Sequence, residues 1–261
     1  MKINFTTFIL LFLVIFFSSC SKIIDFVPIS VDSMLGKQFS TTFETTNPNL
    51  IVLDSSKNVK LYQYLNKIKF QLLSSNKIKH KKDFVWKLKV IKDDSTLNAF
   101  CISGGYIYIY TGIIKFLDNE AQLAGVMAHE IAHADNRHTT SQIIGQYGIS
   151  MLISMFIGSD VSAFVQIGQE LLGLSFSRSD EKQADEFAVN YMYNSQYDAR
   201  QVGGFFEKMI QNNKESALPE LFSTHPASEN RVQEINEIWE KLGKKQGKVF
   251  ENDYNTIKKL I

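Results

Sequence analysis

Two histidines spaced four residues apart, His129 and His133, are the first residues of this 261-residue chain whose spacing indicates chemistry. Positions i and i+4 lie on one face of a helix, so the two imidazoles can hold one zinc ion (Zn2+). Glu130 is offset by about 100° from His129, beside the open position of such a metal. There it can take a proton from zinc-bound water, because zinc lowers the pKa of that water to about 7. The segment therefore predicts hydrolysis at a single zinc ion.

A catalytic zinc site needs a third protein ligand, and an acidic segment downstream offers one. Glu181 and Asp185 are again four residues apart, on one face of an expected helix. Glu181 can bind the metal, and Asp185 can accept a hydrogen bond from the non-ligating nitrogen of His129 or His133. The alternative is a solvated acidic helix face, which is the better interpretation of this segment taken alone.

Two further histidines have different expected roles. His225 stands before Pro226 at the start of an expected helix, where it can hydrogen-bond the oxyanion of a tetrahedral intermediate. A residue that only begins a helix is the alternative. His138 follows His133 by five residues and falls on a different helix face. We interpret it as a non-ligand, although it is the rival of Glu181 for the third position.

The elements that must position these residues are mainly helical. Asp118 or Asn119 can cap a helix over 120–136, and Ser177 with Asp180 can form a capping box for a helix that ends near residue 193. Apolar residues at helical spacing predict further helices over 59–73, 140–157, 161–173, 201–212 and 227–242. The uncharged stretch Ile143–Ile157 is expected to be a buried helix; a patch that dips into a membrane or binds an apolar substrate is the alternative.

Three short segments predict a sheet next to these helices. Apolar and lysine residues alternate over 84–91, and two further strands are expected over 98–103 and 106–111, joined by a turn at Gly104-Gly105. We expect a small antiparallel sheet beside the helix that carries His129. The predicted fold class is therefore α+β, mainly helical.

The N-terminus predicts export and lipidation. Lys2 precedes an apolar run over 8–17, which is about half the length that a spanning helix needs. Residues 1–19 are therefore expected to be a signal peptide. Small residues precede Cys20, as in the lipobox of bacterial lipoproteins, in which the cysteine becomes the lipidated first residue. An ordinary signal peptide or a short anchor is the alternative.

Composition limits the remaining possibilities. The chain is 44% hydrophobic, enough for one sizeable core over 59–261, preceded by a lipidated tether and irregular lead-in over 20–58. Its 28 Lys+Arg nearly balance 27 Asp+Glu, so nucleic acid is not an expected partner. With Cys20 carrying lipid, Cys101 has no intramolecular partner, and we expect it to be a small buried hydrophobe.

Together, these pieces resemble the HtpX-like and CAAX-prenyl-protease-like zinc metallopeptidases, a gluzincin family, over about residues 60–240. The matching residues are Asn98-Ala99-Phe100 with Gly104-Gly105, His129-Glu130-x-x-His133, Glu181-x-x-Ala184-Asp185, and Thr224-His225-Pro226 with Arg231.

The resemblance implies a zincin-like fold, Glu181 as the third ligand, and an endopeptidase that cuts unfolded or membrane-associated proteins. It implies that the strand near Asn98 and Ala99, with Phe100 and Cys101, presents a backbone edge to an extended substrate. Arg178 aligns with a basic residue that braces the site. Integral members of the family carry transmembrane helices, whereas this chain resembles a soluble periplasmic type that lipid holds to a membrane, with the outer membrane favoured.

Two hypotheses about function follow from these observations. The first is an active zinc endopeptidase in envelope quality control, with Glu130 as base and His225 as oxyanion donor. The second is a latent or non-catalytic, chaperone-like binding protein on the same fold, in which Glu181 or another group fills the open metal position. The intact Glu130 argues against the second, because a pure binding protein needs no base there.

Overall fold

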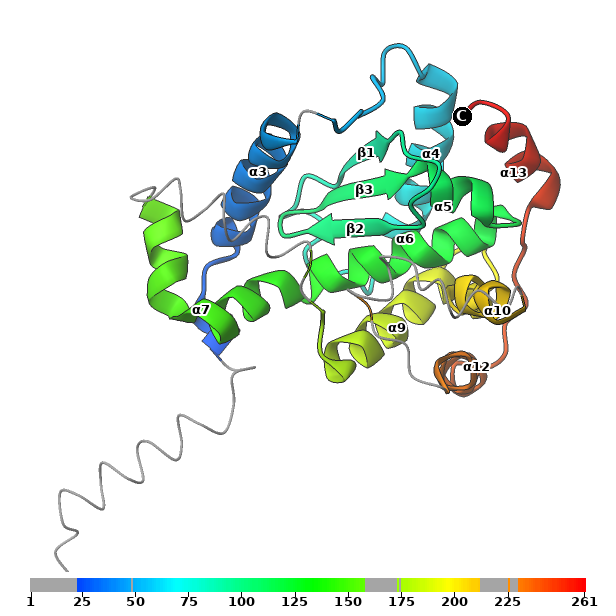
Figure 1. The fold of residues 1–261 in the computed structure, drawn as a ribbon. Helices are drawn as coiled ribbons and strands as arrows, with labels where there is room; N and C mark the ends of the chain where they lie inside the picture. The colour runs from blue at the N-terminus through cyan, green and yellow to red at the C-terminus, as the bar shows by residue number, and fades with distance from the viewer. Residues whose placement is uncertain (1–22, 48, 158–172, 174, 212–224, 226–229) are drawn as a thin grey trace, which may run out of the picture.

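A computed structural model describes residues 23–47, 49–157, 173, 175–211, 225 and 230–261. The expected signal peptide, Cys20, residues 161–172 of the expected helix over 161–173 and the residues on either side of His225 lie outside the described residues. The described part is mainly helical with one small sheet, which confirms the α+β class (Figure 1). Most of the expected helices and strands are present, with ends shifted by a few residues.

The sheet has three strands in the order β1-β3-β2: β1 (Lys87–Ile91), β2 (Ala99–Ile102) and β3 (Tyr106–Tyr110). Gly104 and Gly105 both have positive φ and turn β2 back antiparallel onto β3. β1 pairs with β3 in parallel, so the expectation of a wholly antiparallel sheet is wrong. Residue alternation identifies a strand, but it does not say which neighbour the strand will pair with, and here the hairpin inserts β3 between β1 and β2.

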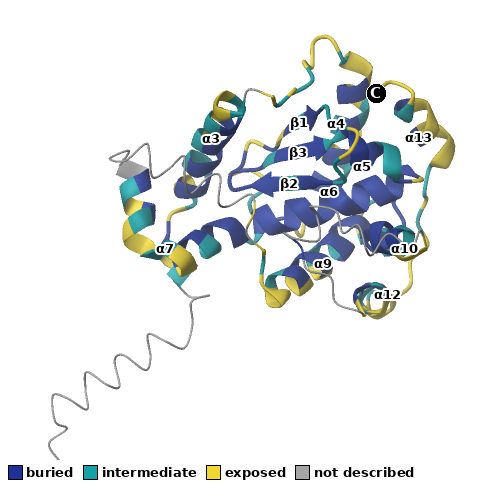
Figure 2. Ribbon diagram, in the orientation of Figure 1, coloured by how far each residue is buried: buried dark blue, intermediate teal, exposed yellow. Residues whose placement is uncertain are grey.

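The helix that carries His129 is α6 (Glu120–Asp135), and all of its residues are buried (Figure 2). The side chain of Asn119 caps it by accepting a hydrogen bond from the Gln122 N–H. α6 runs alongside the sheet and packs on its other side against α9 (Arg178–Tyr193) (Figure 1). α9 begins with the expected capping box of Ser177 and Asp180. These two packed helices bring the expected ligands together.

Further elements pack around α6, α9 and the sheet. They are α4 (Val59–Leu73), α5 (Thr111–Phe116), η2 (Ala199–Val202), α10 (Gly204–Gln211), α12 (Arg231–Lys241) and α13 (Glu251–Lys258). η2 lies very close to α6: a Cβ added to Gly125 would lie 2.4 Å from the Gln201 carbonyl oxygen. Glycine at this position therefore permits the contact.

The lead-in is not irregular where the structure describes it. η1 (Ile24–Phe26) is followed by the helix α3 (Ile29–Thr46), which packs on the opposite face of the sheet from α4. α3 buries an apolar stripe with helical spacing: Val31, Leu35, Phe39 and Phe43. The expectation of an irregular lead-in is wrong because many Ser and Thr residues, which favour helices weakly, conceal this stripe.

The helix α7 (His138–Ile157) bends at Gly148, whose φ is 80°. On one side its residues Ile143, Ile144, Leu152 and Met155 are buried in the same cluster as the apolar stripe of α3. On the other side, Ile149 and Ile153 are about half exposed. The buried interpretation therefore holds for one face of α7. Within the described ranges, no helix is both long and apolar enough to cross a membrane.

Candidate active site

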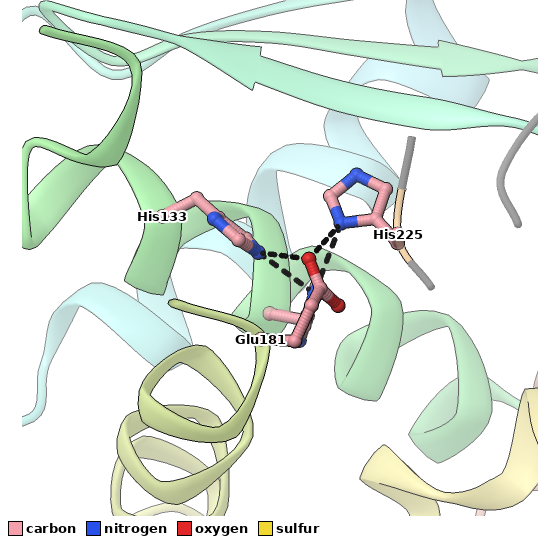
Figure 3. Close-up of side chains that lie close together, drawn as sticks. His133, Glu181 and His225 are labelled. Carbon is pink, nitrogen blue, oxygen red and sulfur yellow. Dashed lines mark hydrogen bonds and ion pairs between the residues drawn. The ribbon is translucent and has the colours of Figure 1, made fainter. Parts of the chain in front are cut away.

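Four side chains that can bind a metal converge between α6 and α9. One candidate ligand atom from each of His129, His133, Glu181 and His225 lies within 4.8 Å of the others, and all four residues are buried. The Nε2 atoms of His129 and His133 are 3.0 Å apart. Glu181 reaches both rings, with Oε1 3.3 Å from His133 Nε2 and Oε2 3.4 Å from His129 Nε2. Figure 3 shows His133, Glu181 and His225 pointing toward one another.

His225 contacts two of the other candidate ligands as well as the expected base. Its Nδ1 is 2.9 Å from Glu181 Oε1 and 3.3 Å from His129 Nε2. Its Nε2 is turned toward Glu130, 3.7 Å from Oε1. The ring can therefore donate a hydrogen bond near the base or supply a fourth ligand, its Nδ1 nitrogen, to the metal, and both roles fit this position.

Asp185 contacts His129 rather than His133. Its Oδ1 is 2.9 Å from His129 Nδ1, and its two oxygens accept hydrogen bonds from Nη2 and Nε of Arg231, at 2.8 and 2.7 Å. Burial opposes ionisation of this carboxyl, but the Arg231 charge and His129 keep the pKa of Asp185 below its usual value. With a metal bound, the imidazole of His129 would carry its proton on Nδ1, next to Asp185, and offer the Nε2 lone pair to the metal.

Arg231 has a place in the site that the spacing of residues did not indicate, although it belongs to the family resemblance. It is buried at the start of α12, and its guanidinium lies over the Phe206 ring, 4.1 Å from the centroid. Its Nη1 is also 3.0 Å from Glu181 Oε2. One arginine thus neutralises the two buried carboxylates of α9, Glu181 and Asp185.

Glu130 is buried next to the sheet edge. Its Oε2 accepts a hydrogen bond from the Cys101 backbone N–H at 3.1 Å, while its Oε1 has no hydrogen-bond partner among the described residues. Burial raises the pKa of the Glu130 carboxyl. A buried carboxylate with one free oxygen and a raised pKa suits a general base.

The expected substrate strand, β2, lies at one edge of the described sheet. Ala99 and Cys101 are buried, and Phe100 stacks on Tyr108 with ring centroids 4.8 Å apart. The Asn98 carbonyl accepts a hydrogen bond from the Tyr110 N–H, so that this carbonyl is already used within the sheet. Burial raises the pKa of the Cys101 thiol well above its usual value, which makes it the neutral, buried side chain that we expected.

One expectation needs correction, and one residue has a contact that the sequence did not indicate. Arg178 is exposed in the first turn of α9, away from the four converging side chains, so Arg231 braces the site in its place. His138 is not among the clustered groups, yet its Nδ1 lies 2.9 Å from His133 Nδ1. The spacing from His133 could not reveal this contact, because the helix ends between the two residues.

The donor set fits a divalent cation. Two imidazole nitrogens and a carboxylate face one another at 3.0–3.4 Å, which is repulsive unless a positive charge, from a proton or from a metal ion, lies between them. Burial opposes a charge on the ring, but hydrogen bonds to Asp185 and Glu181 raise the pKa of His129 to about 9. The pKa of Glu181 is well below its usual range: burial opposes this shift, but three histidines outweigh it. When bound, a divalent metal would supply this charge, polarise a carbonyl group and acidify water.

A small cavity of about 20 Å³ adjoins the cluster, with room for roughly one water molecule. His129, Glu130, His225 and Arg231 form its polar wall, and Val126, Val202, Phe205 and Phe206 form its apolar wall. The cavity thus lies between the side chain of Glu130 and an apolar surface.

Comparison with known proteins places this arrangement in a family. The model of peptidase family M48 matches residues 60–239. The chain is 30% identical over 190 residues to the beta-barrel assembly-enhancing protease of Escherichia coli K12, covering 66% of this chain and 37% of that protein. It is 33% identical over 161 residues to the mitochondrial metalloendopeptidase OMA1 of Schizosaccharomyces pombe, covering 59% of this chain and 47% of that protein.

The chain thus spans between about a third and a half of the length of these relatives. The family match covers more than half of this chain and includes the whole cluster of His129, His133, Glu181 and His225. The chain therefore belongs to peptidase family M48.

Proposed function

We propose that this protein is a zinc-dependent metalloendopeptidase in which Glu130 is the general base. One observation carries the proposal: Glu130 lines a water-sized cavity beside the cluster of His129, His133 and Glu181, and its Oε1 accepts no hydrogen bond from the described residues. A carboxylate in that position can accept a proton from water and later pass it to a leaving amine. The Cys101 N–H holds the other oxygen, so the carboxylate is already oriented.

Zinc is the metal that this donor set favours. Two imidazoles and one carboxylate, with one position left open, are the ligands of catalytic zinc sites in peptidases. Asp185 contacts Nδ1 of His129 and His138 contacts Nδ1 of His133, and these contacts hold the two rings in place.

Unfolded or membrane-associated polypeptides are the proposed substrates. An extended chain can pair with the outer edge of β2, and the Cys101 N–H on that edge already points to Glu130. The name of the Escherichia coli relative refers to β-barrel assembly. Bacterial membrane β-barrels lie in the outer membrane, so we propose a role in envelope quality control, on the periplasmic side. A lipid on Cys20, favouring the outer membrane, is part of this proposal.

Replacement of Glu130 with Gln tests the proposed reaction. Glutamine keeps the size of the side chain but cannot take up the proton, so the variant should bind zinc in the same ratio as wild type and lose cleavage of unfolded casein. The measurements are metal content and peptide release. Cleavage by the variant at the wild-type rate would show that Glu130 is not the general base.

A latent state is the second candidate, and the position of His225 favours it. Its Nδ1 lies 3.3 Å from His129 Nε2 and 2.9 Å from Glu181 Oε1, so one metal ion could contact all three residues. Four protein groups would complete a four-coordinate zinc ion and leave no place for water. A zinc-loaded protein that suppresses aggregation of unfolded chains and cleaves none of them would support this non-catalytic, chaperone-like function.

A further inference from the structure

The two histidines of α6, His129 and His133, have different partners at Nδ1, the nitrogen that faces away from the cluster. His129 Nδ1 contacts the Asp185 carboxylate, whereas His133 Nδ1 lies 2.9 Å from Nδ1 of another imidazole, His138. The Nε2 of His138 is in turn 2.8 Å from Gln183 Oε1 on α9. All three histidines are buried, and the Phe176 ring stacks on His133 with a centroid distance of 4.1 Å.

This chain of contacts allows one arrangement of protons when His133 binds a metal. Its Nε2 faces the cluster, so that atom must offer a lone pair and the ring proton must lie on Nδ1. His133 Nδ1–H then donates to His138 Nδ1, which has to be an acceptor. The proton of His138 consequently lies on Nε2 and donates to the Gln183 carbonyl oxygen. In the opposite arrangement, the His133 Nε2–H would point at the metal and block binding.

We propose that His138 is a positioning residue that holds the tautomer and ring orientation of His133 for metal binding, with Gln183 holding His138. The inference rests on the metal site of the proposed function. It assigns to His138 a role other than that of a ligand, because both of its nitrogens already have partners: Nδ1 faces His133 Nδ1 and Nε2 faces Gln183.

The backbone explains how His138 reaches His133. α6 ends at Asp135, and Arg137 then takes a left-handed conformation, with φ 60°. A side chain other than glycine occupies that region at some cost, so something must hold it. The Arg137 guanidinium donates to Asp32 Oδ2 of α3 and to the Ile24 carbonyl oxygen, at 2.6 and 2.9 Å. The turn therefore brings the first residue of α7 back against the last turn of α6.

A matched pair of variants at position 138 tests the proposal. His138→Leu keeps the bulk and removes the acceptor, while His138→Asn can place its amide oxygen near the position of Nδ1. Both full-length proteins are stripped of metal, and zinc affinity is measured by competition with a chromophoric chelator. Visible spectra of the cobalt-substituted proteins report the ligand geometry independently of activity.

We expect His138→Leu to bind zinc 10- to 100-fold more weakly than wild type, with an altered cobalt spectrum, and His138→Asn to recover most of the affinity. Gln183→Leu should cause a smaller loss, because His138 remains. The melting temperature of each metal-free variant separates a folding defect from a binding defect.

Equal zinc affinity of His138→Leu and wild type would overturn the proposal, as would a His138→Asn variant as weak as His138→Leu. Failure of the wild-type protein to bind zinc would instead overturn the proposed function. The two failures are therefore distinguishable in one titration series.

Discussion

Arg231 donates a hydrogen bond to each oxygen of Asp185, from Nε to Oδ2 at 2.7 Å and from Nη2 to Oδ1 at 2.8 Å, and both residues are buried. Asp185 in turn contacts His129 Nδ1. A bidentate pair of this kind fixes the plane of the carboxylate, which a lysine cannot do. The metal site therefore depends on a residue of α12 that binds no metal itself.

Arg231→Lys should weaken this arrangement. Lysine keeps the charge but loses one of the two hydrogen bonds and the contact of the guanidinium with Phe206. We therefore expect the free energy of unfolding to fall by about 2–4 kcal/mol, and the zinc affinity to fall as well. Chemical denaturation and chelator competition measure the two effects. Arg178→Lys, an exposed change at the start of α9, is the control and should alter neither. Wild-type zinc affinity in Arg231→Lys would show that the orientation of Asp185 does not matter.

His225→Ala separates the two roles that its position allows. If His225 donates a hydrogen bond to the oxyanion, kcat should fall by about 10²–10³ with little change in zinc content, and this is the outcome that we expect. Steady-state kinetics on an unfolded substrate provide the measurement. An increase in kcat would assign His225 to the latent state instead, because its removal would then free a metal position.

Asp32→Ala should weaken the contact of α3 with α7 and with the turn that precedes α7. Asp32 is fully buried, and it accepts hydrogen bonds from Arg137 and from the Thr140 hydroxyl, at 2.6 Å each. Its removal leaves a largely buried arginine without a counter-charge, which typically costs 3–5 kcal/mol. Asp25→Ala, at an exposed acidic residue in the same segment, should change the free energy of unfolding by less than about 0.5 kcal/mol. Similar values for the two variants would contradict this view of α3.

The contact between α3 and the sheet should depend on pH through Glu44. Its carboxylate accepts hydrogen bonds from Tyr108 and Lys89. Burial raises its pKa, but these partners outweigh burial and lower the pKa of Glu44 below 4.5. A depressed pKa means stability that is present above pH 4.5 and lost as the pH falls through the folded value.

Glu44→Gln should therefore reduce the free energy of unfolding by about 1–2 kcal/mol at pH 7, and the difference from wild type should shrink toward pH 3. Urea denaturation of both proteins across this range provides the measurement. A constant difference at all pH values would mean that ionisation of Glu44 contributes nothing.

Two glycine-to-alanine changes in helices should have opposite effects. Gly125→Ala would place a Cβ 2.4 Å from the Gln201 carbonyl oxygen, so α6 and η2 must separate, at a cost of about 1–3 kcal/mol. Gly145→Ala on α7 meets nothing within 4 Å and should stabilise the protein by about 0.5–1 kcal/mol, because alanine favours a helix. Thermal unfolding of both variants provides the comparison; destabilisation of equal size would refute the packing argument.

Local periodicity and capping predicted α4, α6 and α9 well. Asn119 and the Ser177–Asp180 pair cap their helices as expected, since these contacts join residues only three apart. The parallel pairing of β1 could not be predicted in this way, because it depends on the partner that β3 meets after the hairpin. α3 was concealed by its composition, although its apolar residues repeat at helical spacing.

Spacing along the chain was enough to place His129 and His133 on one helix face, and Glu181 and Asp185 on another, because a helix fixes where residues four apart lie. Spacing could not predict that Asp185 contacts His129, that His138 contacts His133, or that Arg231 contacts both Glu181 and Asp185. These contacts cross between α6, α7, α9 and α12. Their geometry follows from how the helices pack and from the left-handed turn at Arg137, which no spacing along the chain specifies.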